Sequence, residues 1–429
     1  MAPKKSGKAK GKAAAAGKSV SGSPSKAVDA ELPPVTFDHM LPAVENSCFR
    51  RLGDCKEVQG SGQTAAFEYP VDRLFEKGSF PVAEVMEYGN HGAERMSGEE
   101  YRERDRLATV HYDDLRRAAE AHRQTRRFMH SVIRPGVTTL EIAQTLEAKS
   151  RQLISAQGLQ AGWAFPTGVS LNNCAAHYTP NYSEDPVVLG QGDIMKVDFG
   201  VHVGGRLVDS AWTVAFDSKF DPLIQATQDA TNTGLKHAGI DVQLGELGGV
   251  IEEVIRSYEM EEGGKTLAIK PIRNLSGHSI EPYRIHAGKS VPIVACDDRD
   301  RMEEGEVYAI ETFASTGRGF VDEVGACSHY MLDYDYAHGH KKAQLRQASA
   351  KPLLNLIQKN FGTLAFCRRW LDDAGAPRHL LHLKGLEQAG IVNPYPPLSD
   401  TEGSYTSQME HTFILRPTCK EIISRGDDY

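Results

Sequence analysis

The stretch that decides the fold reads Ile194-Met-Lys-Val-Asp-Phe-Gly-Val-His-Val203, then Gly204-Gly205, then Arg206-Leu-Val-Asp-Ser-Ala-Trp-Thr-Val-Ala215. Two runs rich in β-branched and aromatic residues, joined by two glycines, predict an antiparallel hairpin with a two-residue turn. This turn pairs Val203 with Arg206 and Gly200 with Asp209, and it therefore pairs Asp198 with Ala211. Because side chains two apart on a strand share a face, Asp198 and Asp209 are diagonal neighbours, with backbones about 7 to 8 Å apart.

The two aspartates are unusual in this setting. Aspartate is depleted inside strands, and both of these stand among apolar residues. Two buried like charges on one face repel strongly unless a cation lies between them. The alternative is that each aspartate is a surface or turn residue, and a one-residue slip in register would place them on opposite faces. The pattern favours a metal site.

Three further segments each offer one potential ligand. His278 follows Gly277, which permits close backbone approach, and Glu311 and Glu410 each stand in an apolar strand-like run. Taken singly, a histidine is more often structural, and a strand glutamate more often faces solvent. Taken together, four carboxylates and a neutral imidazole match two divalent ions about 3.5 to 4 Å apart, an arrangement that serves aminopeptidases among others. Thiolates are absent from the set, which leaves Mn, Fe, Co and Zn open.

Helix signals surround the hairpin. Capping-box patterns at Ser97 and Thr138 predict helices over residues 97–133 and 138–158, and Pro222 suits the first turn of a third. The remaining helical patterns cover residues 221–239, 244–261, 352–360, 365–373 and 379–390, and β-rich runs cover 266–275, 283–294, 306–313 and 407–415. Helix-then-hairpin occurs twice, which predicts an α+β fold of two similar halves.

Composition divides the chain. Residues 1–26 hold seven lysines and no acid, although the net charge of the chain is −8. Such a Lys/Ala/Gly/Ser segment cannot offset the entropy of ordering, so we expect a disordered tail over residues 1–35. An irregular extension over 36–95 and a catalytic domain over 96–429 would follow. The acidic body argues against a folded nucleic-acid-binding domain.

Several classes of protein are disfavoured. The seven cysteines are odd in number and scattered, which argues against a disulfide framework or a structural zinc knuckle. No apolar run approaches the roughly 18 residues of a membrane span. The basic N-terminus is not followed by the apolar stretch of a secretory signal. We therefore expect a cytoplasmic protein.

The order Asp198, Asp209, His278, Glu311, Glu410 resembles the ligand set of the pita-bread metallopeptidases. Within that fold, long segments are similar to methionine aminopeptidases: AFPTG at 164–168, LNNCAAHYTP at 171–180, GHSI at 277–280, RIHAGK at 284–289 and RMEEGEVYAIETF at 301–313. The ending RPTCKEIISRGDDY, and an interval between the two glutamates long enough for a helical insert, resemble the type 2 members. The resemblance covers residues 97–429.

This resemblance implies a pita-bread fold with a helical type 2 insert at about residues 329–395, and a centre of two divalent ions. Asp209 and Glu410 would bridge the ions, Asp198 would complete one, and His278 and Glu311 the other. Glu311 would also shuttle the proton during hydrolysis. The implied activity is co-translational removal of the initiator methionine from nascent proteins whose second residue is small and uncharged.

The resemblance also implies substrate contacts. His177 and His286 would touch the scissile amide and stabilise the tetrahedral intermediate, and His177 matches the position that fumagillin-type epoxides alkylate. The methionine pocket would be lined by Phe165, Ile285, His329 and Tyr395. Glu281 departs from the family pattern, in which a small residue is expected.

The partners implied are nascent polypeptide N-termini, with the basic tail a candidate for ribosome contact. We expect a monomer and no membrane partner. Two alternatives compete: a metal-free pita-bread protein that binds ribosomes or histones, and another aminopeptidase or dipeptidase of the same fold. The complete ligand set argues against the first, and the insert with the Phe165-Pro-Thr-Gly168 segment argues against the second.

Overall fold

The computed structural model describes residues 68–89, 92–345, 347–376 and 378–429. The tail predicted over residues 1–35 and the part of the extension over 36–67 lie outside these ranges.

The helices are α1 (Val71–Leu74), α2 (Gly92–Ser97), α3 (Glu99–Leu107), α4 (Thr109–His130), α5 (Thr139–Ile154), α6 (Asp221–His237), α7 (Leu244–Arg256), α8 (Tyr334–Ala337), α9 (Lys351–Asn360), α10 (Arg368–Asp373) and α11 (Leu380–Gln388), with short 3-10 turns η2 (Gly158–Gln160), η3 (Ser218–Phe220) and η4 (Ala348–Ala350). The strands are β1 (Glu84–Met86), β2 (Ala161–Leu171), β3 (Cys174–Ala176), β4 (Ile194–Val203), β5 (Arg206–Ala215), β6 (Glu259–Glu262), β7 (Lys265–Ala268), β8 (Lys270–Pro271), β9 (Ser276–Ile280), β10 (Ser290–Pro292), β11 (Val307–Ser315), β12 (Asp322–Glu323), β13 (His329–Leu332), β14 (Ala365–Cys367), β15 (Val392–Tyr395), β16 (Leu398–Ser399), β17 (Thr406–Leu415) and β18 (Lys420–Ile422).

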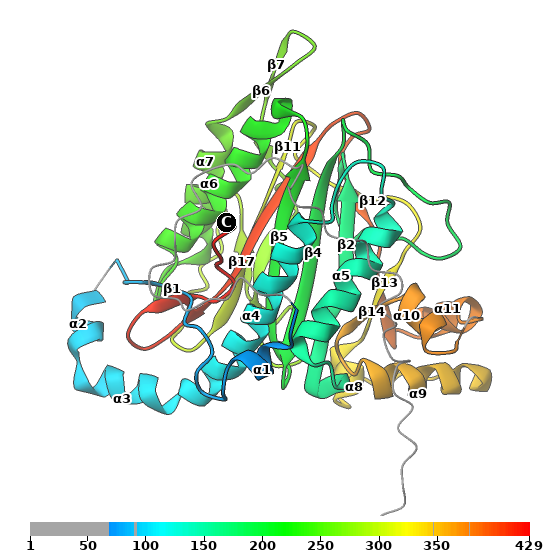
Figure 1. Ribbon diagram of the computed structural model, residues 1–429, viewed down its shortest axis with the longest axis horizontal. Coiled ribbons are helices and arrows are strands. Elements are labelled where there is room, and N and C mark those ends of the chain that lie inside the picture. Colours follow the sequence, from blue (N-terminus) through cyan, green and yellow to red (C-terminus); the bar gives the residue numbers. More distant parts are fainter. Residues whose placement is uncertain (1–67, 90–91, 346, 377) are drawn as a thin grey trace, which may run out of the picture. The chain divides into compact units, whose positions relative to one another are not determined.

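Two helix-plus-sheet halves carry the fold (Figure 1). In one half, α4 and α5 pack on the sheet β2-β4-β5; in the other, α6 and α7 pack on the sheet β1-β18-β17-β11-β9-β10. The halves meet where β5 lies against β17. There the Thr412 hydroxyl accepts from the Asp209 N–H at 2.8 Å and donates to the Asp209 carbonyl at 2.6 Å. The predicted α+β fold of two similar halves is confirmed.

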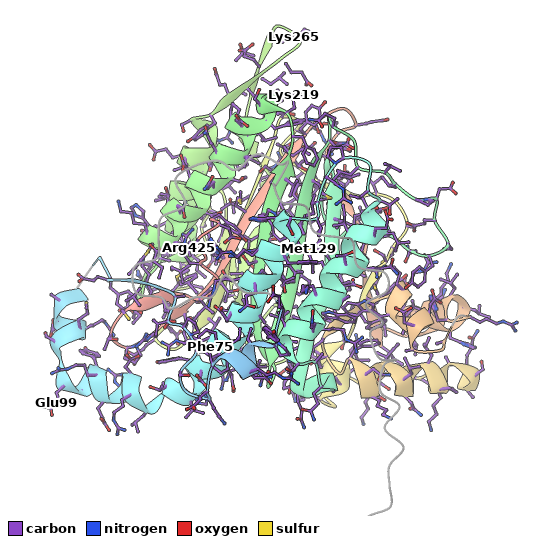
Figure 2. The ribbon with its side chains drawn as sticks, in the orientation of Figure 1. Phe75, Glu99, Met129, Lys219, Lys265 and Arg425 are labelled. Atoms are coloured by element: carbon purple, nitrogen blue, oxygen red, sulfur yellow. The ribbon has the colours of Figure 1, made fainter. Side chains whose placement is uncertain are left out.

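One hydrophobic core runs under both halves, and Met129 on α4, labelled in Figure 2, is fully buried in it. The start of α5 follows the predicted capping box. The Thr138 hydroxyl accepts from the Glu141 N–H at 3.1 Å, and the Glu141 carboxylate accepts from the Thr138 N–H at 2.8 Å. These bonds satisfy two donors that a helix start otherwise leaves without partners.

The capping box predicted at Ser97 is wrong. Ser97 ends α2, and its hydroxyl donates back to the Ala93 carbonyl at 2.7 Å, so it is not available to cap the next helix. The cap residue of α3 is Gly98, with no side-chain bond, and the helical pattern breaks again at Ala108 before α4. Two more boundaries differ. Helix α7 ends at Arg256, and residues 259–262 form β6; in the segment predicted as extension, β1 pairs with β18.

The helical insert has a core of its own. Strands β14-β13-β15 form a small sheet, and α9, α10 and α11 pack around Phe366 and Trp370. The helix predicted over residues 365–373 begins as strand β14, because Ala365 to Cys367 pair with β13. His329 pairs directly with Tyr395, so the insert leaves and rejoins the body at neighbouring positions. Among the helices described here, none is long and apolar enough to cross a membrane.

Candidate metal centre

The hairpin of β4 and β5 has the predicted register. Val203 pairs with Arg206, Gly200 with Asp209, and Asp198 with Ala211. The turn forms because Gly204 and Gly205 take positive φ angles of 57° and 78°, which a type I′ turn requires at both central residues. Asp198 and Asp209 therefore lie on one face.

Three strands of the other half bring the remaining predicted ligands to this face. On the large sheet, Glu311 of β11 pairs with Glu410 of β17, and Ala309 of β11 pairs with His278 of β9. Gly277 makes this close approach possible, because a side chain there would come within 2.3 Å of the Ala309 carbonyl. The five predicted ligands thus come from five strands of two sheets.

The predicted ligands form two groups that share one member. Asp209, His278 and Glu410 offer ligand atoms within 4.8 Å of one another, and so do Asp198, Glu311 and Glu410. Glu410 belongs to both groups, and Glu311 lies with Asp198, whereas the family resemblance assigns it to the ion of His278. Several of the ligand atoms are buried without a hydrogen-bond partner in the described part of the chain: Asp198 Oδ1, Asp209 Oδ1, Glu410 Oε1 and Glu410 Oε2. The His278 ring turns its Nε2 toward Asp209 Oδ2, at 3.5 Å. Buried polar atoms without partners are rare in native proteins, and their convergence here fits divalent cations.

The electrostatics agree with this fit. Burial raises the pKa of Asp209 to about 7. Burial first, and then the neighbouring carboxylates, raise the pKa values of Asp198, Glu311 and Glu410 well above their ordinary range. Groups that cannot all ionise together become ionised when a dication neutralises them. Burial also lowers the pKa of His278 to about 4, so its ring is neutral and can donate a lone pair.

A pocket opens from this centre. Its walls include all six residues predicted for substrate contact: Phe165, His177, Ile285, His286, His329 and Tyr395. His286 stands at the exposed edge, and its ring meets that of His278 edge-on at 4.5 Å. The His177 ring lies 5.9 Å from His329 and 6.0 Å from Tyr395.

The backbone of His177 is strained. Its φ of 63° is uncommon for a residue with a side chain, and such conformations cluster at functional sites. Burial, and after it the neighbouring His286 ring, lowers the pKa of His177 to about 4. The ring is therefore neutral at neutral pH and carries one N–H donor.

The sequence pattern missed other residues of the site. Gln408 donates from Nε2 to Asp198 Oδ2 at 3.1 Å and to Glu311 Oε1 at 2.7 Å, so it ties two predicted ligands together. Strand alternation could have found it, because residues 408 and 410 share a face of β17. Met331 and Ala365 of the insert also line the pocket. No periodicity signal marks them.

Comparison with known proteins decides the family. Residues 113–331 match the model of metallopeptidase family M24. Methionine aminopeptidase 2A of Arabidopsis thaliana is 54% identical over 367 residues, which cover 86% of this chain and 82% of that protein. Methionine aminopeptidase 2 of Schizosaccharomyces pombe is 53% identical over 359 residues, or 84% and 83% of the two chains.

The chain belongs to the type 2 methionine aminopeptidases. It is thus a metallo-exopeptidase of the hydrolase class, and the predicted pita-bread fold is confirmed. A structure of a thermophilic Arx1 has the same fold, with a TM-score of 0.60 at 16% identity, covering 71% of this chain and 88% of that one. At that identity the likeness concerns the fold alone.

Proposed function

We propose that this type 2 methionine aminopeptidase removes the initiator methionine from nascent proteins whose second residue is small and uncharged, with two divalent ions per chain. The observation that carries the proposal is a pair of ligand groups that share Glu410, four of whose members line the same pocket as His177 and His286. Co, Mn, Fe and Zn all suit a ligand set of carboxylates and one imidazole. When bound, such ions supply Lewis-acid chemistry and acidify water.

The protein's own groups would do the rest. Asp198, Asp209, His278, Glu311 and Glu410 would hold the two ions. Glu311 would also accept and return a proton, because its carboxylate has a raised pKa and stands in the pocket wall. Gln408 would hold the Glu311 and Asp198 carboxylates in place through its amide group.

The two histidines would act on the scissile amide. A neutral His177 can donate a hydrogen bond to the carbonyl oxygen as negative charge develops on it. His286, at the exposed edge of the pocket, would contact the amide from the other side. The methionine side chain would pack against the largely apolar wall formed by Phe165, Ile285, His329 and Tyr395.

The deciding experiment measures free methionine released from Met-Ala-Ser and Met-Lys-Ser peptides, with and without a chelator. We expect release from Met-Ala-Ser only, loss of release with the chelator, and recovery when a divalent metal is restored. Asp198→Ala should be inactive, whereas Asp217→Ala, just beyond the same hairpin, should match the wild type. Release that survives the chelator, or equal cleavage of both peptides, would overturn the proposal.

A second test addresses His177. His177→Asn should keep two ions per chain while turnover falls about 10²- to 10³-fold, the loss typical for one polar stabiliser of a transition state. Fumagillin-type epoxides should label the wild type and fail to label this variant. Labelling of another residue would contradict the assignment, and the exposed His340→Asn variant serves as the control.

We also propose that the chain acts as a monomer on nascent N-termini in the cytoplasm, with the basic tail touching the ribosome. Seven lysines without an acid in residues 1–26 suit an RNA surface. The full chain and a chain lacking residues 1–35 should be sedimented with ribosomes at low and high salt. Binding that is equal for both chains would exclude the tail.

A further inference from the structure

A tight turn follows strand β9 and leads into the pocket. The Glu281 and Arg284 backbones bond reciprocally at 3.0 and 2.9 Å, with Pro282 and Tyr283 at the centre of the turn. Tyr283 has a φ of 58°, a conformation that a turn with proline at the preceding position normally gives to glycine or asparagine. A bulky residue there is strained, and it persists only where its surroundings hold it.

Four contacts hold Tyr283. Its N–H donates to the Gly205 carbonyl at 2.8 Å, and its hydroxyl donates to the Leu159 carbonyl at 2.8 Å. Its carbonyl accepts from the Thr363 hydroxyl at 2.6 Å. Its ring fills the space in which Gly205 lacks a side chain, because a Cβ atom there would come within 2.2 Å of the ring.

These contacts reach three separate parts of the structure. Gly205 is the turn of the hairpin that carries Asp198 and Asp209, Leu159 precedes β2, and Thr363 belongs to the insert. Two and three residues beyond Tyr283 stand Ile285 and His286, both in the pocket wall.

The unusual side chain of Glu281 does not shape this turn. It is 56% exposed, and within the described residues its ion pair is with Arg284, at 3.5 Å. The strain and the anchoring contacts both lie at Tyr283. A residue two positions from Glu281 therefore holds the loop.

We infer that Tyr283 is a positioning residue, which fixes the loop of residues 281–286 on the metal-binding hairpin and so sets where His286 stands over His278. The inference rests on the proposed function. It gives the insert a second task, because Thr363 holds the backbone of the same turn. Through Tyr283, the loop is then held to both the hairpin and the insert, which surround the substrate pocket.

The test compares kcat, KM, metal content and thermal melting of three variants. Tyr283→Gly removes the ring and its contacts, Tyr283→Phe removes only the hydroxyl bond, and Thr363→Val removes only the bond from the insert. We expect kcat of Tyr283→Gly to fall about 10²-fold, as a displacement of roughly 1 Å at a reacting centre can cause. The kcat values of Tyr283→Phe and Thr363→Val should fall less, and the metal content of all three variants should equal that of the wild type.

The matched control is Tyr88→Phe. The Tyr88 hydroxyl donates to the Arg416 and Cys419 carbonyls at 2.7 and 2.9 Å, and neither residue lines the pocket. This variant loses the same atom as Tyr283→Phe, so it should melt lower and keep the wild-type kcat.

A double-mutant cycle separates positioning from general support. In a His286→Ala background, adding Tyr283→Gly should cost little further kcat, because the residue through which it acts is gone. Additive losses, or a loss of kcat that only follows lost metal or lost folded protein, would overturn the inference. If the wild type releases methionine and Tyr283→Gly is equally active, the inference is wrong but the proposed function stands. If the wild type releases no methionine, both the proposed function and the inference are wrong.

Discussion

Two buried charged clusters lie on opposite faces of the same pair of strands, and they are built by opposite rules. Asp209 on β5 and Glu410 on β17 face the metal centre, whereas the next residue on each strand, Ser210 and His411, faces the other way. We call the group behind the strands the C-terminal cluster; it comprises Glu84, Arg126, Ser210, His411, Ser424, Arg425, Asp428 and Tyr429.

In the C-terminal cluster, charges and hydrogen bonds are paired. Arg126 donates two bonds of 2.7 Å to Asp428, and its guanidinium lies 4.5 Å from the centre of the Tyr429 ring. The Tyr429 hydroxyl meets that of Ser210 at 2.7 Å. Arg425, labelled in Figure 2, donates to Glu84 at 2.9 Å. Burial would raise the pKa of Asp428, but the charge of Arg126 outweighs it and holds that pKa well below its usual range.

The metal centre is also largely buried, but its carboxylates share one sign of charge, and several of their oxygen atoms have no hydrogen-bond partner in the described chain. The difference teaches that burial of charge alone does not mark function. A buried cluster that is neutral overall stabilises the fold, whereas one that is incomplete by itself points to a ligand.

The largest contrast should come from two matched substitutions. Asp209→Asn should abolish metal binding and methionine release, yet raise the melting temperature of the metal-free protein, because one of several repelling charges is removed. Asp428→Asn should lower the melting temperature, because it leaves Arg126 buried without its counterion. Melting curves in chelator and metal analysis measure both. If both substitutions lower the melting temperature equally, the two clusters do not differ in the way described.

Arg126→Met removes the other partner of the buried Arg126–Asp428 ion pair. It should lower the free energy of unfolding by about 3 to 5 kcal/mol, the usual result of removing one partner of a buried ion pair. Urea unfolding measures this change. The neighbouring Arg127 pairs with Asp427 at 2.7 Å at a partly exposed position, so Arg127→Met should cost only about 0 to 1 kcal/mol. Equal costs would contradict the comparison.

The metal centre should be sensitive to its supporting amide. Gln408→Leu should weaken metal affinity about 10- to 100-fold, as loss of a group that orients metal ligands commonly does. Isothermal titration with Mn²⁺ or Co²⁺ measures the affinity directly. Gln124 is another buried glutamine, bonded to Glu120 at 2.9 Å on α4, and Gln124→Leu should leave the affinity unchanged. A Gln408→Leu protein with wild-type affinity would remove Gln408 from the site.

The smallest effect is a pH dependence of opposite sign in the two clusters. The folded pKa of Asp209 is raised to about 7, so its contribution to stability is present below the unfolded pKa of about 3.9 and lost as pH rises through 7. Asp428, with a lowered pKa, contributes above about pH 4 and loses its contribution below. Metal-free protein should melt about 2 to 4 °C lower at pH 8 than at pH 5. Asp209→Asn should reduce this difference, and a difference that persists unchanged would assign it to other groups.

The sequence predicted what is locally determined. The hairpin register follows from two adjacent glycines, and the α5 cap follows from Thr138 and Glu141, whose bonds span three residues. The Ser97 pattern has the same form and failed, because the preceding helix α2 offered that hydroxyl a closer acceptor at Ala93. A capping pattern says which bonds can form, and the neighbouring element decides which of them do.

The assembly of the site could not be derived from local pattern. Glu311 and Glu410 are directly paired although the whole insert lies between them in the sequence, and only the resemblance to a family linked them beforehand. Gln408 and Tyr283 were missed because their importance lies in what they touch. Neither glutamine nor tyrosine is a residue type whose presence in a sequence by itself indicates metal binding or acid–base catalysis.

Because His329 pairs with Tyr395, the insert leaves and rejoins the body at adjacent positions. The insert of one relative can therefore replace that of another without moving the two ends of the body to which it is joined. Both junction residues line the pocket, as do Met331 and Ala365 within the insert. Exchange of this segment between relatives would therefore transplant one wall of the substrate pocket while leaving all five predicted metal ligands in the recipient body.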